Sequence, residues 1–410
     1  MTVVVVVVGA GQAGVQVAAS LREHGHAGRV VLVDTEEPLP YQRPPLSKTY
    51  LTDREPAEPT LRSAAFYAEH GIELRTGTRV RAVDVAAGVV TFGDGADLRW
   101  TDLVLATGSR PVPLAVPGTD LGGVLPLRTL ADARRLRALL PSVRRVVVIG
   151  GGFIGLEVAG AALTSGAAVT VLEAAPRLLG RSVTATTAEV LLAHHRRWGI
   201  DVRVAAKATE IVGEHGKVRA VRTSDGDLLP AELVVVGIGI TARDELAREA
   251  GLAVDDGIVV DAGLRTAHPH VYAIGDCARF PGPGVSTVRL ESVQNATDQA
   301  EHVAQAIATG ATAPYGAVPW FWSHQHGARL QMAGLTTGTD DTVVTGDPGK
   351  PAFSVYCFRG GALVGVESVN RPADHLKARK LLAEGRPVRR TEFGAGPGVT
   401  AGRLSREERS

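Results

Sequence analysis

Residues 3–14 read VVVVVVGAGQAG, an apolar run that leads directly into three glycines. A run of this kind, bounded by a glycine turn, predicts a buried strand, and a helix of about residues 13–24 follows it. In this arrangement Gly9 makes the tight turn, Gly11 lets the backbone approach a pyrophosphate, and Gly14 lets the helix pack on the strand. The free N–H groups at the start of the helix attract the phosphates. The stretch therefore predicts a dinucleotide-binding α/β unit.

The same pattern returns at residues 145–155, which read RVVVIGGGFIG. Gly150, Gly152 and Gly155 take the places of the first three glycines, and a helix to about residue 165 follows. One Gly-x-Gly-x-x-Gly motif is weak evidence, but two of them, each between a valine-rich strand and a helix, are a strong signal. The sequence predicts two Rossmann-like domains.

Each repeat ends its second strand on an acidic residue. Asp34 and Glu173 lie about 20 residues beyond the third glycine, where a carboxylate accepts hydrogen bonds from ribose hydroxyls. Glu36 and Glu37 follow Asp34 closely, so any of these three could instead be a solvated loop residue. At Glu173 a negative charge would repel the 2′-phosphate of NADPH and favour NADH, whereas the nearby Arg177 could accommodate that phosphate.

A third region begins near residue 315, where aromatic residues cluster at 320–322 and short alternating runs follow at 352–358 and 362–369. Alternation of this kind predicts an antiparallel sheet. The expected fold class is thus α/β, with two Rossmann-like dinucleotide-binding domains and a C-terminal α+β domain. The expected boundaries are 1–112 with 242–315 for the first domain, 113–241 for the second, 316–400 for the third and 401–410 for a flexible tail, with a linker near 110–127.

Composition excludes several classes of protein. The chain has 44 basic and 43 acidic residues, so no overall field attracts it to nucleic acid or to a membrane. Residues 3–8 are too few for a signal peptide, and no other stretch has the roughly 18 uninterrupted apolar residues of a membrane-spanning helix. Cys277 and Cys357 are too few for a disulfide framework, a zinc site or an iron–sulfur cluster. We expect a soluble cytoplasmic protein that holds no metal.

Eight further motifs resemble those of the FAD-dependent ferredoxin reductases that serve bacterial haem-thiolate monooxygenases and ring-hydroxylating dioxygenases. The likeness covers nearly the whole chain, and the first and seventh motifs are the most specific. The motifs are YQRPPLSK at 41–48, ATGSRP at 106–111, LRTLADA at 127–133, GGGFIGLEVA at 150–159, AIGDCARF at 273–280, RLESVQNA at 289–296, PWFWS at 319–323 and SVNRPAD at 368–374.

This resemblance implies that the first domain holds FAD, that the inserted second domain holds NADH, and that the C-terminal domain completes the flavin site. Asp276 would bond the ribityl chain of the flavin, unless it is an ordinary turn residue. A helix from Val293 would aim its positive end at the flavin pyrimidine. The candidate cofactor-binding residues are Gly9, Gly11, Ala13, Gly14, Asp34, Arg43, Lys48, Val80, Ala106, Thr107, Gly108, Arg128, Gly275, Asp276, Ser292, Val293, Gly150, Gly152, Ile154, Gly155, Glu157, Glu173 and Gly239.

The resemblance also implies a catalytic site of Lys48, Glu157 and Trp320. In the family, residues like Lys48 and Glu157 lie together beside the reactive edge of the flavin, where opposite charges keep each other ionised. The alternative makes Glu157 an exposed helix residue and Lys48 a loop cation. Trp320 and Trp322 lie, in the family, between the flavin and the docking partner, although packing alone would also explain them.

The predicted function is electron transfer from NADH through FAD to a two-iron two-sulfur ferredoxin with an acidic surface, and from there to an oxygenase. The chain has no close cysteine pair, so the next redox centre belongs to another molecule. A basic docking patch could include Arg289, Arg329 or Arg371. Many relatives have an acid at the position of His324, which could change partner preference. The alternatives are a rubredoxin reductase, another NADH-dependent flavin reductase delivering to oxygen or a quinone, and an NADH-sensing flavoprotein similar to the apoptosis-inducing factors.

Overall fold

The computed structural model describes residues 3–282, 284–385 and 388–393 and divides the chain into two compact units. The predicted tail at 401–410 lies outside the described residues. Unit 1 comprises Met1–Arg43, Ala57–Arg110 and Ile240–Ala317, and unit 2 comprises Pro44–Pro56, Pro111–Gly239 and Val318–Ser410.

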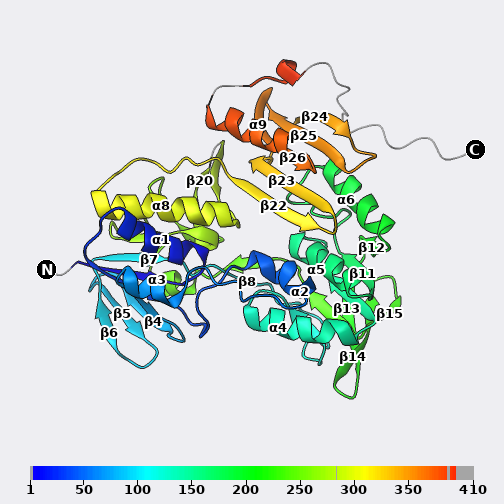
Figure 1. The fold of residues 1–410 in the computed structure, drawn as a ribbon, viewed down its shortest axis with the longest axis horizontal. Helices are drawn as coiled ribbons and strands as arrows, with labels where there is room; N and C mark the ends of the chain where they lie inside the picture. Colours follow the sequence, from blue (N-terminus) through cyan, green and yellow to red (C-terminus); the bar gives the residue numbers. More distant parts are fainter. Residues whose placement is uncertain (1–2, 283, 386–387, 394–410) are drawn as a thin grey trace, which may run out of the picture. The chain divides into compact units, whose positions relative to one another are not determined.

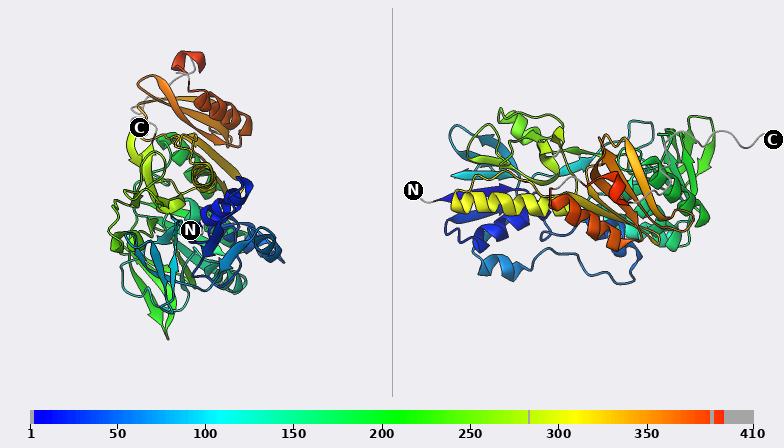
Figure 2. Two further views of the ribbon diagram at one scale, coloured as in Figure 1. Left: turned by 90° about the vertical axis from the view of Figure 1, so that its left-hand side faces the viewer. Right: turned by 90° about the horizontal axis from the view of Figure 1, so that it is seen from above.

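Unit 1 is built on a five-stranded parallel sheet in the order β19-β7-β1-β2-β3. Helices α1 and α8 lie side by side against it (Figures 1 and 2). The valine run forms β1, because a strand buried on both faces of a parallel sheet favours valine throughout. The strand is one residue shorter than predicted. The elements are β1 Val4–Val8, α1 Gln12–Glu23, β2 Arg29–Val33, β3 Ile72–Arg75, β7 Asp102–Leu105, β19 Val271–Ala273 and α8 Val293–Thr309.

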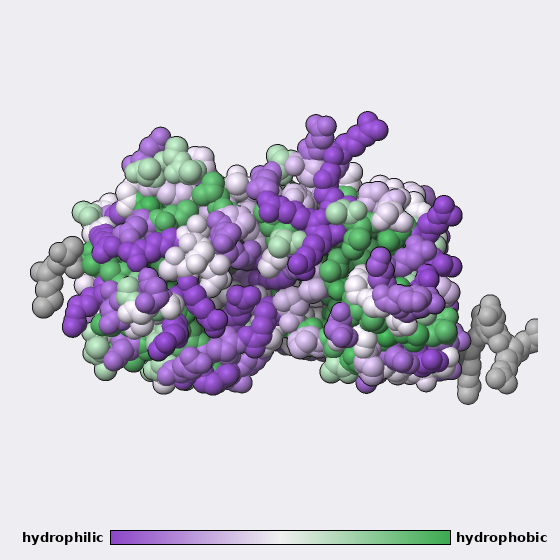
Figure 3. All heavy atoms as spheres, turned by 90° about the horizontal axis from the view of Figure 1, so that it is seen from below, coloured by the Kyte–Doolittle hydropathy of each residue, from purple (hydrophilic) through white to green (hydrophobic). Residues whose placement is uncertain are grey.

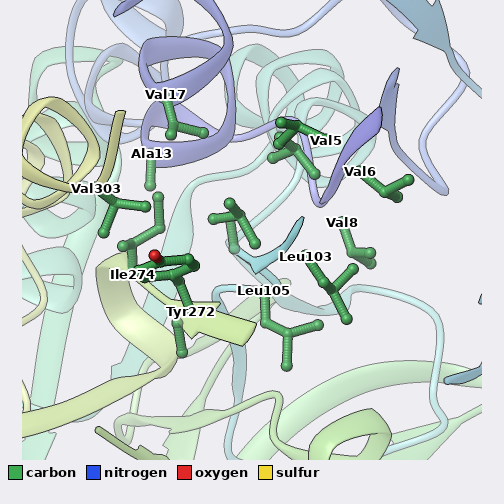
Figure 4. Packing of buried hydrophobic residues seen from close by; sticks show 14 of the residues in the cluster. Val5, Val6, Val8, Ala13, Val17, Leu103, Leu105, Tyr272, Ile274 and Val303 are labelled. Atoms are coloured by element: carbon green, nitrogen blue, oxygen red, sulfur yellow. The ribbon is translucent and has the colours of Figure 1, made fainter. Parts of the chain in front are cut away.

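The core of unit 1 joins this sheet to its helices. Figure 4 shows Ala13 of α1, Val303 of α8 and Ile274 close together, among the buried side chains of β1 and β7. Burying apolar surface of this kind is the main favourable term in folding. Smaller elements complete the unit: α3 Ala64–Glu69, β4 Val80–Asp84, β5 Val89–Phe92, β6 Asp97–Arg99, α7 Glu245–Glu249, β18 Ile258–Val259, η3 Gly275–Cys277, β20 Ala278–Gly282 and β21 Val285–Val288.

Unit 2 contains a second parallel sheet, in the order β12-β11-β10-β16-β9. Strand β9 falls inside the stretch predicted as a linker, and it pairs in parallel with β16. Three residues are too few to show a hydrophobic period, which is why the sequence did not reveal this strand. The elements are β9 Val124–Pro126, α4 Leu130–Leu139, η2 Leu140–Ser142, β10 Arg145–Ile149, α5 Phe153–Thr164, β11 Ala168–Glu173, α6 Ala185–Arg197, β12 Asp201–Val204, β13 Ala208–Glu214, β14 Lys217–Thr223, β15 Leu228–Pro230 and β16 Leu233–Val236.

Unit 2 also contains a five-stranded antiparallel sheet, in the order β22-β23-β26-β25-β24. Helix α9 packs on it through contacts with β23 and β26. The predicted alternating runs are β25 and β26, so the predicted fold class, two Rossmann-like domains and a C-terminal α+β domain, is confirmed. The elements are β22 Trp320–Gln325, β23 Ala328–Gly334, β24 Asp341–Asp347, β25 Ala352–Arg359, β26 Ala362–Val369, α9 Pro372–Ala383 and η4 Arg390–Phe393.

The short segment Pro44–Pro56 belongs to unit 2, although the predicted boundaries count it with the first domain. It contains η1 Pro44–Ser47 and α2 Thr49–Thr52. Leu51 joins the buried core of unit 2, and Arg137 of α4 donates hydrogen bonds to the carbonyl oxygens of Asp53 and Arg54. Where the chain crosses between the units, β8 Ser109–Pro111 pairs with β17 Ile240–Ala242.

None of the described helices is long and apolar enough to cross a membrane. The face of the molecule in Figure 3 carries hydrophilic residues over much of its area, with smaller hydrophobic areas between them.

Candidate functional site

The two glycine loops have the same geometry. Gly9 and Gly150 have φ of +104° and +115°, and a Cβ at either would collide with a backbone carbonyl oxygen of a neighbouring strand end. At Gly14 and Gly155 a Cβ would collide with the carbonyl oxygen of the first glycine of the same loop. Both observations explain why these positions require glycine. They are the turn and packing roles predicted for the first and third glycines.

The middle glycines differ, because apart from their own chain neighbours no atom of the described residues lies within 4 Å of a Cβ built at Gly11 or at Gly152. No contact within the described part of the chain therefore requires glycine at these two positions, so glycine there fits a ligand that approaches the backbone. Gly11 and Gly152 are also the N-caps of α1 and α5, and neither helix start has a side-chain cap or an acidic residue in its first turn. Each loop thus fits the pyrophosphate of a dinucleotide.

Asp34 and Glu173, the acidic residues at the strand ends, each accept hydrogen bonds from the backbone of the adjacent loop. Asp34 accepts hydrogen bonds from the backbone N–H groups of Ala10, at 2.8 Å, and Glu36, at 2.9 Å. Glu173 accepts them from Gly151 and Ala175, both at 2.7 Å. The sequence did not reveal this role. A carboxylate oxygen accepts more than one hydrogen bond, so ribose binding by Asp34 and Glu173 stays a prediction.

Replacing Glu173 with glutamine is expected to raise the ratio of NADPH to NADH activity about tenfold, since it removes one negative charge near the expected 2′-phosphate. The amide oxygen keeps one hydrogen bond to the second loop. FAD content should not change, because the first domain is expected to hold FAD. Steady-state kcat/KM with each coenzyme measures this. Glu189→Gln, which neutralises an exposed carboxylate on α6, is the control. An unchanged ratio would exclude the charge as the determinant, and loss of FAD would mean that the two nucleotide assignments are reversed.

Within unit 1, the returning segment meets the first loop. A Cβ at Gly275 would lie 3.1 Å from Cβ of Ala13 and 3.8 Å from Cβ of Ala296, so small residues allow this close approach. Asp276 accepts a hydrogen bond from the Ser109 hydroxyl at 2.9 Å. The hydroxyl of Ser292 caps α8, which begins at Val293 as predicted. Five candidate FAD positions, Ala13, Gly275, Asp276, Ser292 and Val293, therefore lie around one end of the sheet.

Three more candidates surround the end of β7. Ala106 donates its backbone N–H to Val8, and Thr107 and Gly108 both bond to the backbone of Arg243. Val80, which is more distant in sequence, is the first residue of β4 and is buried.

Arg43 lies in a cluster of its own. It forms an ion pair with Glu36 at 2.8 Å, and Glu36 also accepts a hydrogen bond from the hydroxyl of Tyr41. Although burial opposes ionisation, Arg43 and these hydrogen bonds lower the pKa of Glu36. Glu36 is therefore a partner of Arg43 and not a freely solvated loop residue.

Within unit 2, Lys48 and Glu157 form the predicted ion pair, with Nζ 2.7 Å from Oε2. Glu157 lies on α5 and only 4% of it is exposed, which excludes the alternative of a solvated helix residue. Its Oε2 also accepts from the hydroxyl of Ser47, and its Oε1 accepts from that of Ser323 at 2.6 Å. Three donors surround this carboxylate, which holds it in one orientation.

The remaining candidates of unit 2 are dispersed. Arg128 precedes α4 and donates its backbone N–H to Asp132. Ile154 is 42% exposed in the first turn of α5, where an apolar contact to a ligand is available. Gly239 has φ of +123° at the crossing of the chain.

Trp320 begins β22 and packs among polar and aromatic neighbours. Its ring lies 5.3 Å from that of Trp322 and 5.9 Å from that of His375, and the guanidinium of Arg379 lies 4.5 Å from its centroid. A cation over an aromatic face is a favourable electrostatic contact. The tryptophan is half-buried, so packing accounts for part of its role.

One expected docking residue is excluded by its surroundings. The side chain of Arg289 is 9% exposed, and it pairs with Glu291 and Asp256 and donates to the carbonyl oxygen of Asp276. Its charge is neutralised within unit 1. The prediction that Arg289 contributes to a basic docking patch is therefore wrong.

The sequence did not reveal two carboxylate contacts. The first is the hydrogen bond from Ser323 to Glu157, which the alternation of Ser323 and Gln325 along β22 could have indicated. Glu367 of β26 is fully buried and accepts hydrogen bonds from the N–H and hydroxyl of Thr184, the N-cap of α6. Burial raises the pKa of Glu367. In the sequence, the feature that could have indicated this role is an acidic residue within the apolar run of β26.

Comparison with known proteins agrees with this geometry. A model of the pyridine nucleotide-disulphide oxidoreductases matches residues 3–300, and a reductase C-terminal model matches residues 320–396. Rhodocoxin reductase of Rhodococcus erythropolis is 46% identical over 386 residues, which cover 94% of this chain and 90% of that protein.

Two solved structures share the whole fold. The ferredoxin reductase for the CYP199A2 system of Rhodopseudomonas palustris has a TM-score of 0.91 and 44% identity, over 94% of this chain and 96% of that one. The covalent complex of putidaredoxin reductase with putidaredoxin gives a TM-score of 0.91 and 40% identity, over 95% of each chain. The predicted resemblance is confirmed: this chain belongs to the pyridine nucleotide-disulphide oxidoreductases, a family of enzymes that use FAD and NAD(P)H.

Proposed function

We propose that this chain is an NADH-dependent reductase of a two-iron two-sulfur ferredoxin, which supplies a haem-thiolate monooxygenase or a ring-hydroxylating dioxygenase. The observation that carries the proposal concerns the cysteines. Cys277 and Cys357 are the two cysteines of the sequence, and both are free and fully buried. Burial raises the pKa of both thiols, so neither is a reactive thiolate. Electrons therefore leave for another molecule. The names of the similar reductases support a ferredoxin as that molecule.

FAD, when bound, would supply the redox chemistry, which is acceptance of a hydride from NADH and release of the two electrons one at a time. The residues of this chain bind and orient. Gly11 and the start of α1 hold one pyrophosphate, and Gly152 and the start of α5 hold the other. Asp276, whose carboxylate accepts a hydrogen bond from the hydroxyl of Ser109, would bind the ribityl hydroxyls.

We assign Lys48 and Glu157 a supporting role beside the flavin. Their opposite charges lie 2.7 Å apart, so the pair presents a fixed dipole. Hydride transfer requires no proton from either side chain. The pair acts by setting the electrostatic environment, not by acid–base catalysis.

We assign electron exit to the region of Trp320. Arg379 lies over this ring, and Arg329 is exposed on the neighbouring strand β23. These cations suit a ferredoxin with an acidic surface, because complementary charge speeds association. Arg371 contributes less, since it pairs with Asp374 at 2.6 Å.

The function is tested by mixing the purified holoenzyme anaerobically with NADH or NADPH and recording the loss of flavin absorbance. Candidate two-iron ferredoxins are then added with cytochrome c as the final acceptor. Fast bleaching by NADH and ferredoxin-dependent reduction of cytochrome c are expected. Slow bleaching with a lasting charge-transfer band and no cytochrome c reduction would indicate an NADH sensor. Reduction through rubredoxin or a quinone alone would also contradict the proposal.

A further inference from the structure

The buried face of β22 follows the length of α5 within unit 2. Alternation along the strand places Phe321, Ser323 and Gln325 on one face. The ring of Phe321 lies 4.5 Å from that of Phe153, and the hydroxyl of Ser323 reaches Glu157, one helical turn farther along α5. Helix and strand lie side by side in Figure 1 and contact each other.

The close approach of the two elements depends on a glycine. A Cβ at Gly160, on the next turn of α5, would lie 3.1 Å from Cβ of His326, the residue after β22. A larger residue at position 160 would push the strand from the helix. The contact between Ser323 and Glu157 is thus built by packing on both sides.

A chain of hydrogen bonds continues from Glu157 into α6. Ser323 Oγ accepts from Gln325 Nε2 at 3.2 Å, and Gln325 Oε1 lies 3.0 Å from His195 Nε2. Ser323, Gln325 and His195 are all fully buried. The chain therefore joins β22 and α6, which are distant in sequence, to the ion pair of Lys48 and Glu157.

Only one arrangement of protons satisfies this chain. An ionised carboxylate only accepts, so Ser323 gives its single proton to Glu157 and accepts from the amide of Gln325. The amide oxygen then faces His195, which must carry its proton on Nε2. Within the described residues Nδ1 of His195 has no partner, so the ring is neutral. Every donor points toward Glu157.

The chain is unsuited to carrying protons. An amide would have to pass through its imidic acid form to relay one, and the neutral ring at the far end has no donor behind it. Its remaining effect is geometric: it fixes the Oε1 side of Glu157 while Lys48 and Ser47 fix the Oε2 side.

We propose that Ser323, Gln325 and His195 are positioning residues, which orient Glu157 and through it Lys48 for hydride transfer to the flavin. The inference rests on the proposed function for the place of the ion pair. Without the hydroxyl of Ser323, Oε1 of Glu157 would be buried without a donor, and the carboxylate would rotate to find one. The carboxyl-terminal sheet would thereby control a pair carried by the rest of unit 2.

Stopped-flow reduction by NADH, without ferredoxin, tests the inference in the holoenzyme. Ser323→Ala is expected to lower the limiting rate of flavin reduction about tenfold, with the NADH Kd within about twofold. Ser323→Thr, which keeps the hydroxyl, should restore the rate. In a Glu157→Gln background the Ser323→Ala change should have little further effect, because both act through one carboxylate.

Ser354→Ala is the matched control, since Ser354 is a fully buried serine of the same sheet that bonds to Ser368 and Asp374 instead. An equal fall in Ser354→Ala, additive effects with Glu157→Gln, or an unchanged rate in Ser323→Ala would overturn the inference. If Ser323→Ala does not retain FAD, Gln325→Leu replaces it in the same cycle, with an expected fall of about threefold. Failure to reduce ferredoxin would contradict the proposed function alone, because this assay contains none.

Discussion

Replacing Gly11 with alanine is expected to leave the chain folded but to lower its affinity for FAD about 100-fold. Beyond its chain neighbours, no described residue has an atom within 4 Å of the new methyl group, so the apoprotein has room for it. A pyrophosphate in contact with the backbone leaves no room for the methyl group. Overlap of this kind costs up to about 3 kcal/mol, or about 100-fold in binding affinity. Flavin content after purification and FAD titration of the apoprotein measure the effect.

The second loop supplies the counterpart. The methyl group of Gly152→Ala also has no contact among the described residues beyond its chain neighbours, and this variant is expected to retain FAD while the KM for NADH rises at least about tenfold. If Gly152→Ala loses FAD and Gly11→Ala keeps it, the order of the two nucleotides is reversed. Gly14→Ala differs from both, because its methyl group collides with the carbonyl oxygen of Gly9. That variant should lose stability as well as flavin, which circular dichroism would show.

The contrast among these glycines shows how much of the site is local in sequence. The three glycines that make the turn, the close approach and the helix packing lie within six positions, so the spacing of Gly9, Gly11 and Gly14 was enough to predict the loop, although Gly9 itself is confined by the distant Ala106. The strands and helices beside it followed from the same apolar runs. Their observed ends differ from the predicted ones by about one residue, as fraying leads one to expect.

Other parts of the site have no local signal. Lys48 and Glu157 are 109 residues apart, and Ser323 and Glu157 are 166 apart. Only resemblance suggested the first pair, and nothing suggested the second. Alternation along 320–325 could have placed Ser323 and Gln325 on one buried face, but the partner of that face depends on tertiary packing. The same holds for Pro44–Pro56, whose place in unit 2 depends on Arg137 and on backbone carbonyl groups.

His375 is a buried histidine whose surroundings suit only its neutral form. It is 1% exposed on α9, and within the described part of the chain neither ring nitrogen has a hydrogen-bond partner. Burial, with a smaller contribution from the charge of Arg379, lowers the pKa of His375 to about 4. The ring is held by packing against Trp320, so a phenyl group of similar shape should fit the same space.

His375→Phe is therefore expected to stabilise the protein at pH 7.5 by about 1 kcal/mol, because it removes two unpaired buried nitrogens. The larger effect appears in acid. The folded-state pKa of His375 is about 4 and the ordinary pKa of a histidine is 6.5, so between these pH values the unfolded state binds the proton first. Wild-type stability then falls as the pH drops from about 6.5 to about 4, by up to roughly 1.4 kcal/mol per pH unit from this residue. The variant lacks this loss.

Hydrogen exchange in peptides of α9 and β22 measures the effect locally, since a chain of two units need not unfold in one step. At pH 5 these peptides should be protected more strongly in His375→Phe than in the wild type. His195 is the control, because burial also lowers its pKa to about 4 but its Nε2 bonds to Gln325. His195→Phe would leave that amide oxygen buried without a donor, and it should lose stability at pH 7.5. Equal losses of stability in His375→Phe and His195→Phe would contradict the prediction. They would mean that His375 also has a hydrogen-bond partner, since only a ring without one gains stability when it is made apolar.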